Sequence, residues 1–127
     1  MARPPKDNAE YFSHGAHERN SKEMRALRAK YGPEGYAVAL MLLETLTDAP
    51  HFTIDESPVT MELIAGDFGV TTEHLIDIIQ YLTKIQFLIS SDGILSCPSL
   101  IERMQPLILK RKSRRHTDQP EEVMAAE

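Results

Sequence analysis

Apolar residues follow a helical period through most of the chain, and its first half predicts two consecutive helices. Asn20 is placed to cap a helix with Glu23 three residues later, and Gly32-Pro33 is placed to end it. A second helix is expected over roughly 33–48, where apolar side chains cover nearly the whole surface. Such a helix is buried centrally or covered by another subunit, so it is the expected core helix and a candidate homodimer contact.

The middle of the chain predicts two more helices. The third is expected over roughly 57–68, with Ser57 as its cap and Gly69 in a left-handed conformation at its end. Thr71 or Thr72 caps the fourth helix, which is expected to continue to about residue 85. Its buried stripe has helical spacing and consists of Leu75, Ile78, Ile79, Leu82 and Ile85.

A hairpin is predicted after the fourth helix. Two β-prone stretches within 87–97 flank Asp92-Gly93, a strong short-range hairpin signal. The segment 52–54 is a candidate for a further short strand. Ser99 is expected to cap a last helix, which Pro106 kinks or restarts.

The spacing of small and apolar residues in the third and fourth helices is typical of a helix-turn-helix. Ala65 lets the two helices approach closely, and Gly69 supplies a positive φ in the turn. Leu75 and Ile78 fix the second of these helices in the core. Because a hairpin follows directly, the predicted fold is mainly α with a small β-hairpin, a winged helix-turn-helix. The fourth helix is its expected recognition helix and residues 87–97 its wing.

The length of 127 residues predicts one domain with a tail at each end. Residues 1–12 contain two prolines and no periodicity, so they are expected to form a flexible N-terminal arm. The winged-helix domain is expected over 13–112. The segment 113–127, first basic and then acidic, is expected to be a disordered tail.

Composition favours a soluble cytoplasmic protein. Hydrophobic residues make up 42% of the chain and charged residues 26%, both ordinary for globular proteins. The single cysteine, Cys97, excludes an internal disulfide and is typical of a reducing compartment. The longest apolar run, 36–43, is shorter than the roughly 20 residues that cross a bilayer, and the N-terminus lacks the apolar stretch of a signal peptide. We therefore expect no membrane contact.

Charge is segregated along the sequence. Residues 1–30 carry seven basic and four acidic residues, 31–109 carry two basic and eleven acidic residues, and 110–116 carry five basic residues. A basic cluster is the footprint expected for a phosphate backbone, although basic residues also suit the C-terminal end of a helix. The predicted phosphate contacts are Lys22, Arg25, Arg28, Lys110, Arg111, Lys112, Arg114 and Arg115. The predicted groove contacts are His74, Gln80 and Lys84.

Protein binding is the alternative function at this stage. The fourth helix also carries Glu73 and Asp77, which repel phosphates, and the tip of the hairpin has no basic residue. DNA binding is therefore expected to be weak, mainly non-specific and strongly dependent on salt. In the alternative, the winged helix is a scaffold for oligomerisation or for a partner with a basic surface.

No catalytic constellation accompanies this pattern. The sequence has no Gly-x-Ser-x-Gly motif and no phosphate-binding glycine loop. His14 and His17 are close to metal-ligand spacing, but no second pair of Cys or His ligands lies near them in sequence. Cys97 is typical of a small buried apolar residue. We expect a non-catalytic protein without metal or cofactor.

Several segments together resemble a known family. They are Tyr11-Phe-Ser-His14, Arg19-Asn20, Leu27-Arg-Ala-Lys-Tyr-Gly32, Glu34-Gly-Tyr36, Leu43-Glu44, Gly93-Ile-Leu-Ser-Cys-Pro-Ser-Leu100 and the Lys/Arg run that follows. Over roughly 9–115 the chain resembles the N-terminal domain of phage-type replication proteins, a domain similar to the N-terminal winged helix of DnaD-like replisome organisers. The resemblance implies a role in replication initiation of a phage or mobile element, through binding to DNA, to replication proteins or to itself.

Overall fold

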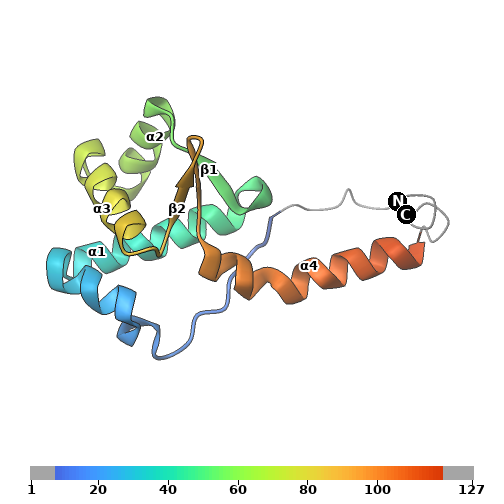
Figure 1. Cartoon of the computed structure of the whole chain (residues 1–127). Coiled ribbons are helices and arrows are strands. Elements are labelled where there is room, and N and C mark those ends of the chain that lie inside the picture. Colours follow the sequence, from blue (N-terminus) through green and yellow to red (C-terminus); the bar gives the residue numbers. More distant parts are fainter. Residues whose placement is uncertain (1–7, 119–127) are drawn as a thin grey trace.

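The computed structural model describes the backbone of residues 8–118 and the side chains of residues 8–111. This part of the chain is mainly helical with a small antiparallel sheet, which confirms the coarse fold class predicted from sequence (Figure 1). Short 3-10 helices precede and follow the first long helix at Glu18–Asn20 and Pro50–Phe52. The other elements are α1 (Lys22–Asp48), β1 (Thr53–Asp55), α2 (Pro58–Phe68), α3 (Thr72–Lys84), β2 (Ile89–Ser91), β3 (Ile94–Ser96) and α4 (Pro98–Asp118).

Helix α1 contains the first two predicted helices, joined across a break at Gly32. Gly32 has φ 72° and ψ −165°, a conformation that glycine adopts without a steric penalty and that interrupts the helix. The side chain of Ser21 caps the first half, accepting a hydrogen bond from the N–H of Met24 at 3.2 Å. The prediction of Asn20 as the cap is wrong by one residue, because Asn20 is held in the preceding 3-10 turn by its N–H bond to the carbonyl of His17.

The second half of α1 forms the centre of the hydrophobic core. Val38, Leu42 and Leu46 are at most 1% exposed. The core is completed by residues of the other elements, among them Leu75, Ile78, Leu82, Leu88, Leu95 and Leu100. The chain thus covers most of the apolar surface of this helix itself, and the homodimer through the helix stays a prediction.

Helices α2 and α3 begin and turn as their sequence predicts. Ser57 caps α2 by accepting a hydrogen bond from the N–H of Thr60, and Thr71 caps α3 through the N–H of His74. Gly69 between them has φ 76° and ψ 27°, the left-handed conformation that ends α2. The predicted turn is confirmed, and the helices that it joins pack against each other.

The predicted hairpin and its third strand are both confirmed. Strands β2 and β3 pair antiparallel around Asp92-Gly93, with Ser90 opposite Leu95. Strand β1 pairs with the other edge of β3, with Ile54 opposite Leu95, so the strand order is β1-β3-β2. Ile54 and Leu95 are buried, and this face of the sheet closes the core.

The last helix starts two residues earlier than expected. The carbonyl of Cys97 accepts a hydrogen bond from the N–H of Ile101 at 3.1 Å, so Cys97 occupies the cap position and Pro98 the first helical position. The prediction of Ser99 as the cap is therefore wrong. Helix α4 includes Pro106 and continues to Asp118, past the expected domain boundary at residue 112. The remaining tail residues, 119–127, lie outside the described part of the chain.

Residues 8–13 of the chain run between α1 and α4 (Figure 1). Ala9 is buried, and its N–H donates to the carbonyl of Thr47 at 2.9 Å. From α4, Arg111 donates to the carbonyl of Asn8 at 2.8 Å and Arg103 donates to the carbonyl of Ser13 at 3.0 Å. The described part of the predicted arm is therefore tied down along its length, whereas residues 1–7 lie outside the described residues.

The α2–α3 turn supplies a test with an internal control. A Cβ at Gly69 meets no neighbour, so Gly69→Ala should lower the free energy of unfolding through backbone strain alone, by about 1–2 kcal/mol. Gly66 is helical and its Cβ position is also open, so Gly66→Ala should raise the free energy of unfolding by about 0.5–1 kcal/mol. Urea denaturation of both variants measures the two signs. Equal effects at the two positions would contradict this account of the turn.

Candidate nucleic-acid interface

The packing of α3 against α1 determines which of its side chains face outward. The hydroxyl of Tyr31 on α1 donates to Asp77 Oδ2 at 2.7 Å, and the hydroxyl of Tyr81 donates to the carbonyl of Ala26 at 3.5 Å. Earlier residues of α3 thus meet later residues of α1, and the two helices are antiparallel. The end of α3 that carries Lys84 consequently lies toward the start of α1 that carries Lys22.

A cluster of rings with a lysine fills this helix contact. The Tyr31 and Tyr81 rings meet edge to face with centroids 5.7 Å apart, and Lys30 Nζ lies 4.5 Å from the centroid of Tyr81. A cation over an aromatic face is attracted by the negative charge of the ring face. Gly35 makes room for this arrangement, because a Cβ there would lie 2.6 Å from the Cβ of Tyr31.

His74 belongs to the same contact rather than to an open groove surface. Its Nε2 lies 3.2 Å from Glu34 Oε1 on α1, and its ring packs against Tyr31 at 6.0 Å. The side chain is only 35% exposed. Of the three predicted groove contacts, Gln80 and Lys84 are exposed, whereas His74 faces α1.

The other side of α3 borders a groove that the sequence patterns did not indicate. It has a volume of about 410 Å³ and lies between α3, the start of α2 and the hairpin. Ile76 and Gln80 line it from α3, opposite Glu56 and Ser90, whose side chains hydrogen-bond to each other. Ile76 is 37% exposed. Its position could have been found by noting that it falls outside the buried stripe of α3.

Acidic residues dominate the half of the molecule that contains α2, α3 and the sheet. Residues 53–96 carry seven acidic residues and one basic residue, Lys84. Glu73 and Asp77 on α3 are both exposed. A phosphate backbone lying along the whole of α3 would be repelled, so attraction is confined to the end with Lys84.

The basic residues predicted on α1 differ in their availability. Lys22 and Arg25 are exposed. Arg28 is half-buried and donates to the carbonyl of Arg19 at 2.8 Å, and its Nε is buried without an acceptor among the described residues. The geometry therefore gives Arg28 a role in fastening the 3-10 turn to α1. Lys22 and Arg25 stay exposed on the part of α1 toward which the Lys84 end of α3 lies.

The second group of predicted phosphate contacts is on α4, far from the first. Lys110 is exposed, and Arg111 is half-buried against the arm. The side chains of Lys112, Arg114 and Arg115 lie outside the described residues, although the backbone there is helical. The start of α1 and the end of α4 lie at opposite sides of the molecule, so the sequence-predicted set divides into two surfaces (Figure 1).

The remaining sequence candidates form no reactive centre. His14 lies 3.4 Å from the hydroxyl of Tyr36, and no group of three or more His, Cys, Asp or Glu side chains capable of holding a metal occurs among the described residues. Burial raises the pKa of the Cys97 thiol, against the opposing effect of the N–H groups of Leu100 and Ser99. A thiol with a raised pKa is a weak nucleophile. Within the described part of the chain, no helix has the length and apolar character needed to cross a membrane.

The structure is a small helical domain with a three-stranded sheet, in which the helix pair α2 and α3 carries mostly acidic residues. The family model described as "Lin1244/Lin1753-like, N-terminal" matches residues 11–96, from the arm through β3. The chain belongs to this family. The curated proteins and the solved structures contain no significant match.

The contact between Tyr31 and Asp77 predicts a distinct titration. Burial, with the hydrogen bond and charge of Asp77, raises the pKa of Tyr31 to about 12. The folded state keeps a proton that the unfolded state releases above the ordinary tyrosine pKa of about 10, so stability falls as pH rises from about 10 to 12. Ultraviolet absorbance of tyrosinate should show one late step, which Tyr31→Phe removes and Asp77→Asn moves to lower pH. A late step that survives in Tyr31→Phe would assign it to another residue.

Proposed function

We propose that the chain is a non-catalytic, cytoplasmic DNA-binding domain with a winged-helix fold. The order of α2, the turn at Gly69, α3 and the hairpin β2–β3, with β1 at the far edge of the sheet, supports the winged helix. The single, buried cysteine supports a reducing compartment. The observation that supports DNA binding is the antiparallel packing of α1 and α3, which puts the Lys84 end of α3 toward the start of α1, where Lys22 and Arg25 are exposed.

This surface, made of Lys22, Arg25 and Lys84, binds phosphates rather than bases. Each cation that replaces a condensed counterion contributes to a sequence-independent affinity that falls with salt. The carboxylates of Glu73 and Asp77 repel the phosphates of a duplex from the earlier turns of α3. Few side chains of the helix therefore reach base edges. Binding is consequently weak, non-specific and dependent on salt.

The biological setting of the proposal is replication initiation in a phage or mobile element. It is supported by the resemblance to phage-type replication proteins, whose more specific parts are Tyr11-Phe-Ser-His14 and the segment from Lys30 to Tyr36. A domain that binds duplex DNA without sequence preference fits a role as replisome organiser, in which replication proteins determine the site and this domain holds the DNA.

A salt series tests the phosphate surface. With a labelled duplex, the slope of log affinity against log salt should become shallower by about 0.9 for each of Lys22→Ala, Arg25→Ala and Lys84→Ala. Ala37 is exposed on the second half of α1, so Ala37→Glu changes net charge equally without touching the surface and should leave the slope unchanged. Fluorescence anisotropy measures all four variants. Slopes that follow net charge alone, or a wild-type chain that binds no duplex at low salt, would contradict the proposal.

A second candidate function is self-association as a protein-interaction module. Of the seven large apolar side chains exposed among the described residues, five lie on α2, α3 and the hairpin: Val59, Leu63, Ile76, Ile89 and Ile94. The same region is acidic, and residues 110–116 of another copy carry five basic residues. Apolar surface together with complementary charge favours a head-to-tail contact between copies.

Sedimentation velocity tests this candidate. The chain should associate with rising concentration at low salt and dissociate at high salt, because opposite charges drive the contact. Leu63 is 70% exposed, so Leu63→Asp should weaken association without disturbing the core, and Ala37→Asp should leave it unchanged. A chain that stays monomeric at every concentration would exclude self-association.

A further inference from the structure

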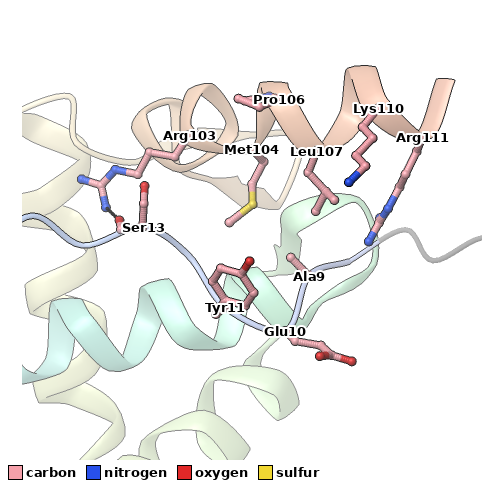
Figure 2. Close-up of a pocket in the computed structure, with 10 residues that line it drawn as sticks. All are labelled: Ala9, Glu10, Tyr11, Ser13, Arg103, Met104, Pro106, Leu107, Lys110 and Arg111. Carbon is pink, nitrogen blue, oxygen red and sulfur yellow. Dashed lines mark hydrogen bonds between the residues drawn. The ribbon is translucent and has the colours of Figure 1, made fainter. Parts of the chain in front are cut away.

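The arm and α4 enclose a crevice that contains an exposed aromatic ring. The crevice has a volume of about 480 Å³, within the range of small-ligand sites. Tyr11 enters it from the arm, opposite Met104, Leu107 and Lys110 of α4 (Figure 2). The chain has eight aromatic residues, Phe and Tyr together, and all eight are described. Seven are buried or half-buried, whereas Tyr11 is 81% exposed.

Tyr11 is presented on a fixed backbone. The hydrogen bonds of Ala9 to Thr47 and of Arg103 to Ser13 hold the chain on both sides of it, and Phe12 packs against the core. Because the backbone on both sides of Tyr11 is already ordered before a ligand binds, little conformational entropy is lost when a planar group stacks on the ring. The exposed ring is therefore a pre-organised stacking surface.

Charge differs between the two sides of Tyr11. On the α4 side lie Lys110 and Arg111, followed in sequence by Lys112, Arg114 and Arg115. Glu10 also lines the crevice, but its side chain points away from α4 (Figure 2). It lines a second hollow as well, with two more acidic residues, Glu44 and Asp48. An anionic backbone next to Tyr11 is consequently attracted along α4 and repelled from the opposite side.

We propose that this crevice binds single-stranded DNA, with one unpaired base stacked on Tyr11 and the adjacent phosphates at Lys110 and Arg111. An aromatic platform beside cationic side chains is the arrangement that holds single strands without sequence preference. Bases in a duplex are already stacked on one another and leave no free face for Tyr11. The inference rests on the proposed function, because both take DNA as the ligand. It uses a surface separate from that of Lys22, Arg25 and Lys84.

The test compares an oligothymidylate of about twelve nucleotides with a duplex, by fluorescence anisotropy in the full chain. Tyr11→Ala should weaken binding of the oligothymidylate roughly 5- to 150-fold and leave duplex binding unchanged. Tyr11→Phe keeps the stacking face and should bind as the wild type does. Leu109 is 61% exposed on α4 and does not line the crevice, so Leu109→Ala is the matched control and should change neither affinity.

A second readout does not depend on the affinity. The chain has no Trp, so its intrinsic emission comes from its four tyrosines, and a base stacked on Tyr11 should quench part of it. That part should be missing in Tyr11→Ala. Because Tyr11 is 81% exposed, the variant should unfold at the wild-type temperature, which a thermal melt verifies.

The outcomes separate this inference from the function on which it rests. Duplex binding together with unchanged oligothymidylate affinity in Tyr11→Ala would overturn the crevice and leave the proposed function intact. Equal losses for both DNA forms, or a loss in Tyr11→Phe as large as in Tyr11→Ala, would also overturn stacking on the ring. A chain that binds neither DNA form would overturn both proposals.

Discussion

Burial of the second half of α1 is the interaction on which the other elements depend. Its side chains Val38, Leu42 and Leu46 are nearly inaccessible to solvent, and full burial of such a residue contributes about 1.5–3 kcal/mol. Helix α3 and the sheet cover this helix, and the arm is fastened to its end through the carbonyl of Thr47. Each candidate binding surface is therefore made of elements whose positions follow from one central helix.

The two candidate DNA-binding surfaces lie at separate places on a domain with a net negative charge. The acidic half, residues 53–96, cannot attract DNA along its whole length, so cations are effective only where other elements bring them to its edges. One edge lies where α1 meets the end of α3, and the other where the arm meets α4. Grouping of the cations at two separate places explains how a chain of net charge −5 could engage paired DNA at one surface and unpaired DNA at the other, despite its acidic half.

Local signals predicted the elements well, and tertiary contacts account for the differences. The end of α2 at Gly69 and the turn at Asp92-Gly93 are set by a few neighbouring residues, so the sequence contains enough information to find them. The caps at Asn20 and Ser99 were misplaced because nearby residues, Ser21 and Cys97, occupy the cap positions, and the local turn geometry decides between the candidates. The orientation of His74 toward Glu34 depends on packing between helices that no local pattern encodes. The exposure of Tyr11 likewise depends on the tertiary contacts that hold the arm, and residues 1–12 have no periodicity from which it could be predicted.

The break at Gly32 affects how Lys22 and Arg25 of α1 are oriented. In a continuous helix, the orientation of the buried half would also fix the orientation of the first turns. Here the residues before Gly32 take their direction from the contacts of Tyr31 and Lys30 with α3. The first half of α1 is thus held both by α3 and by its own core residues, Met24 and Leu27. The spacing between Lys84 and the cations Lys22 and Arg25 therefore depends on the tyrosine cluster as well as on the core, and a substitution at Tyr31 or Tyr81 would alter it.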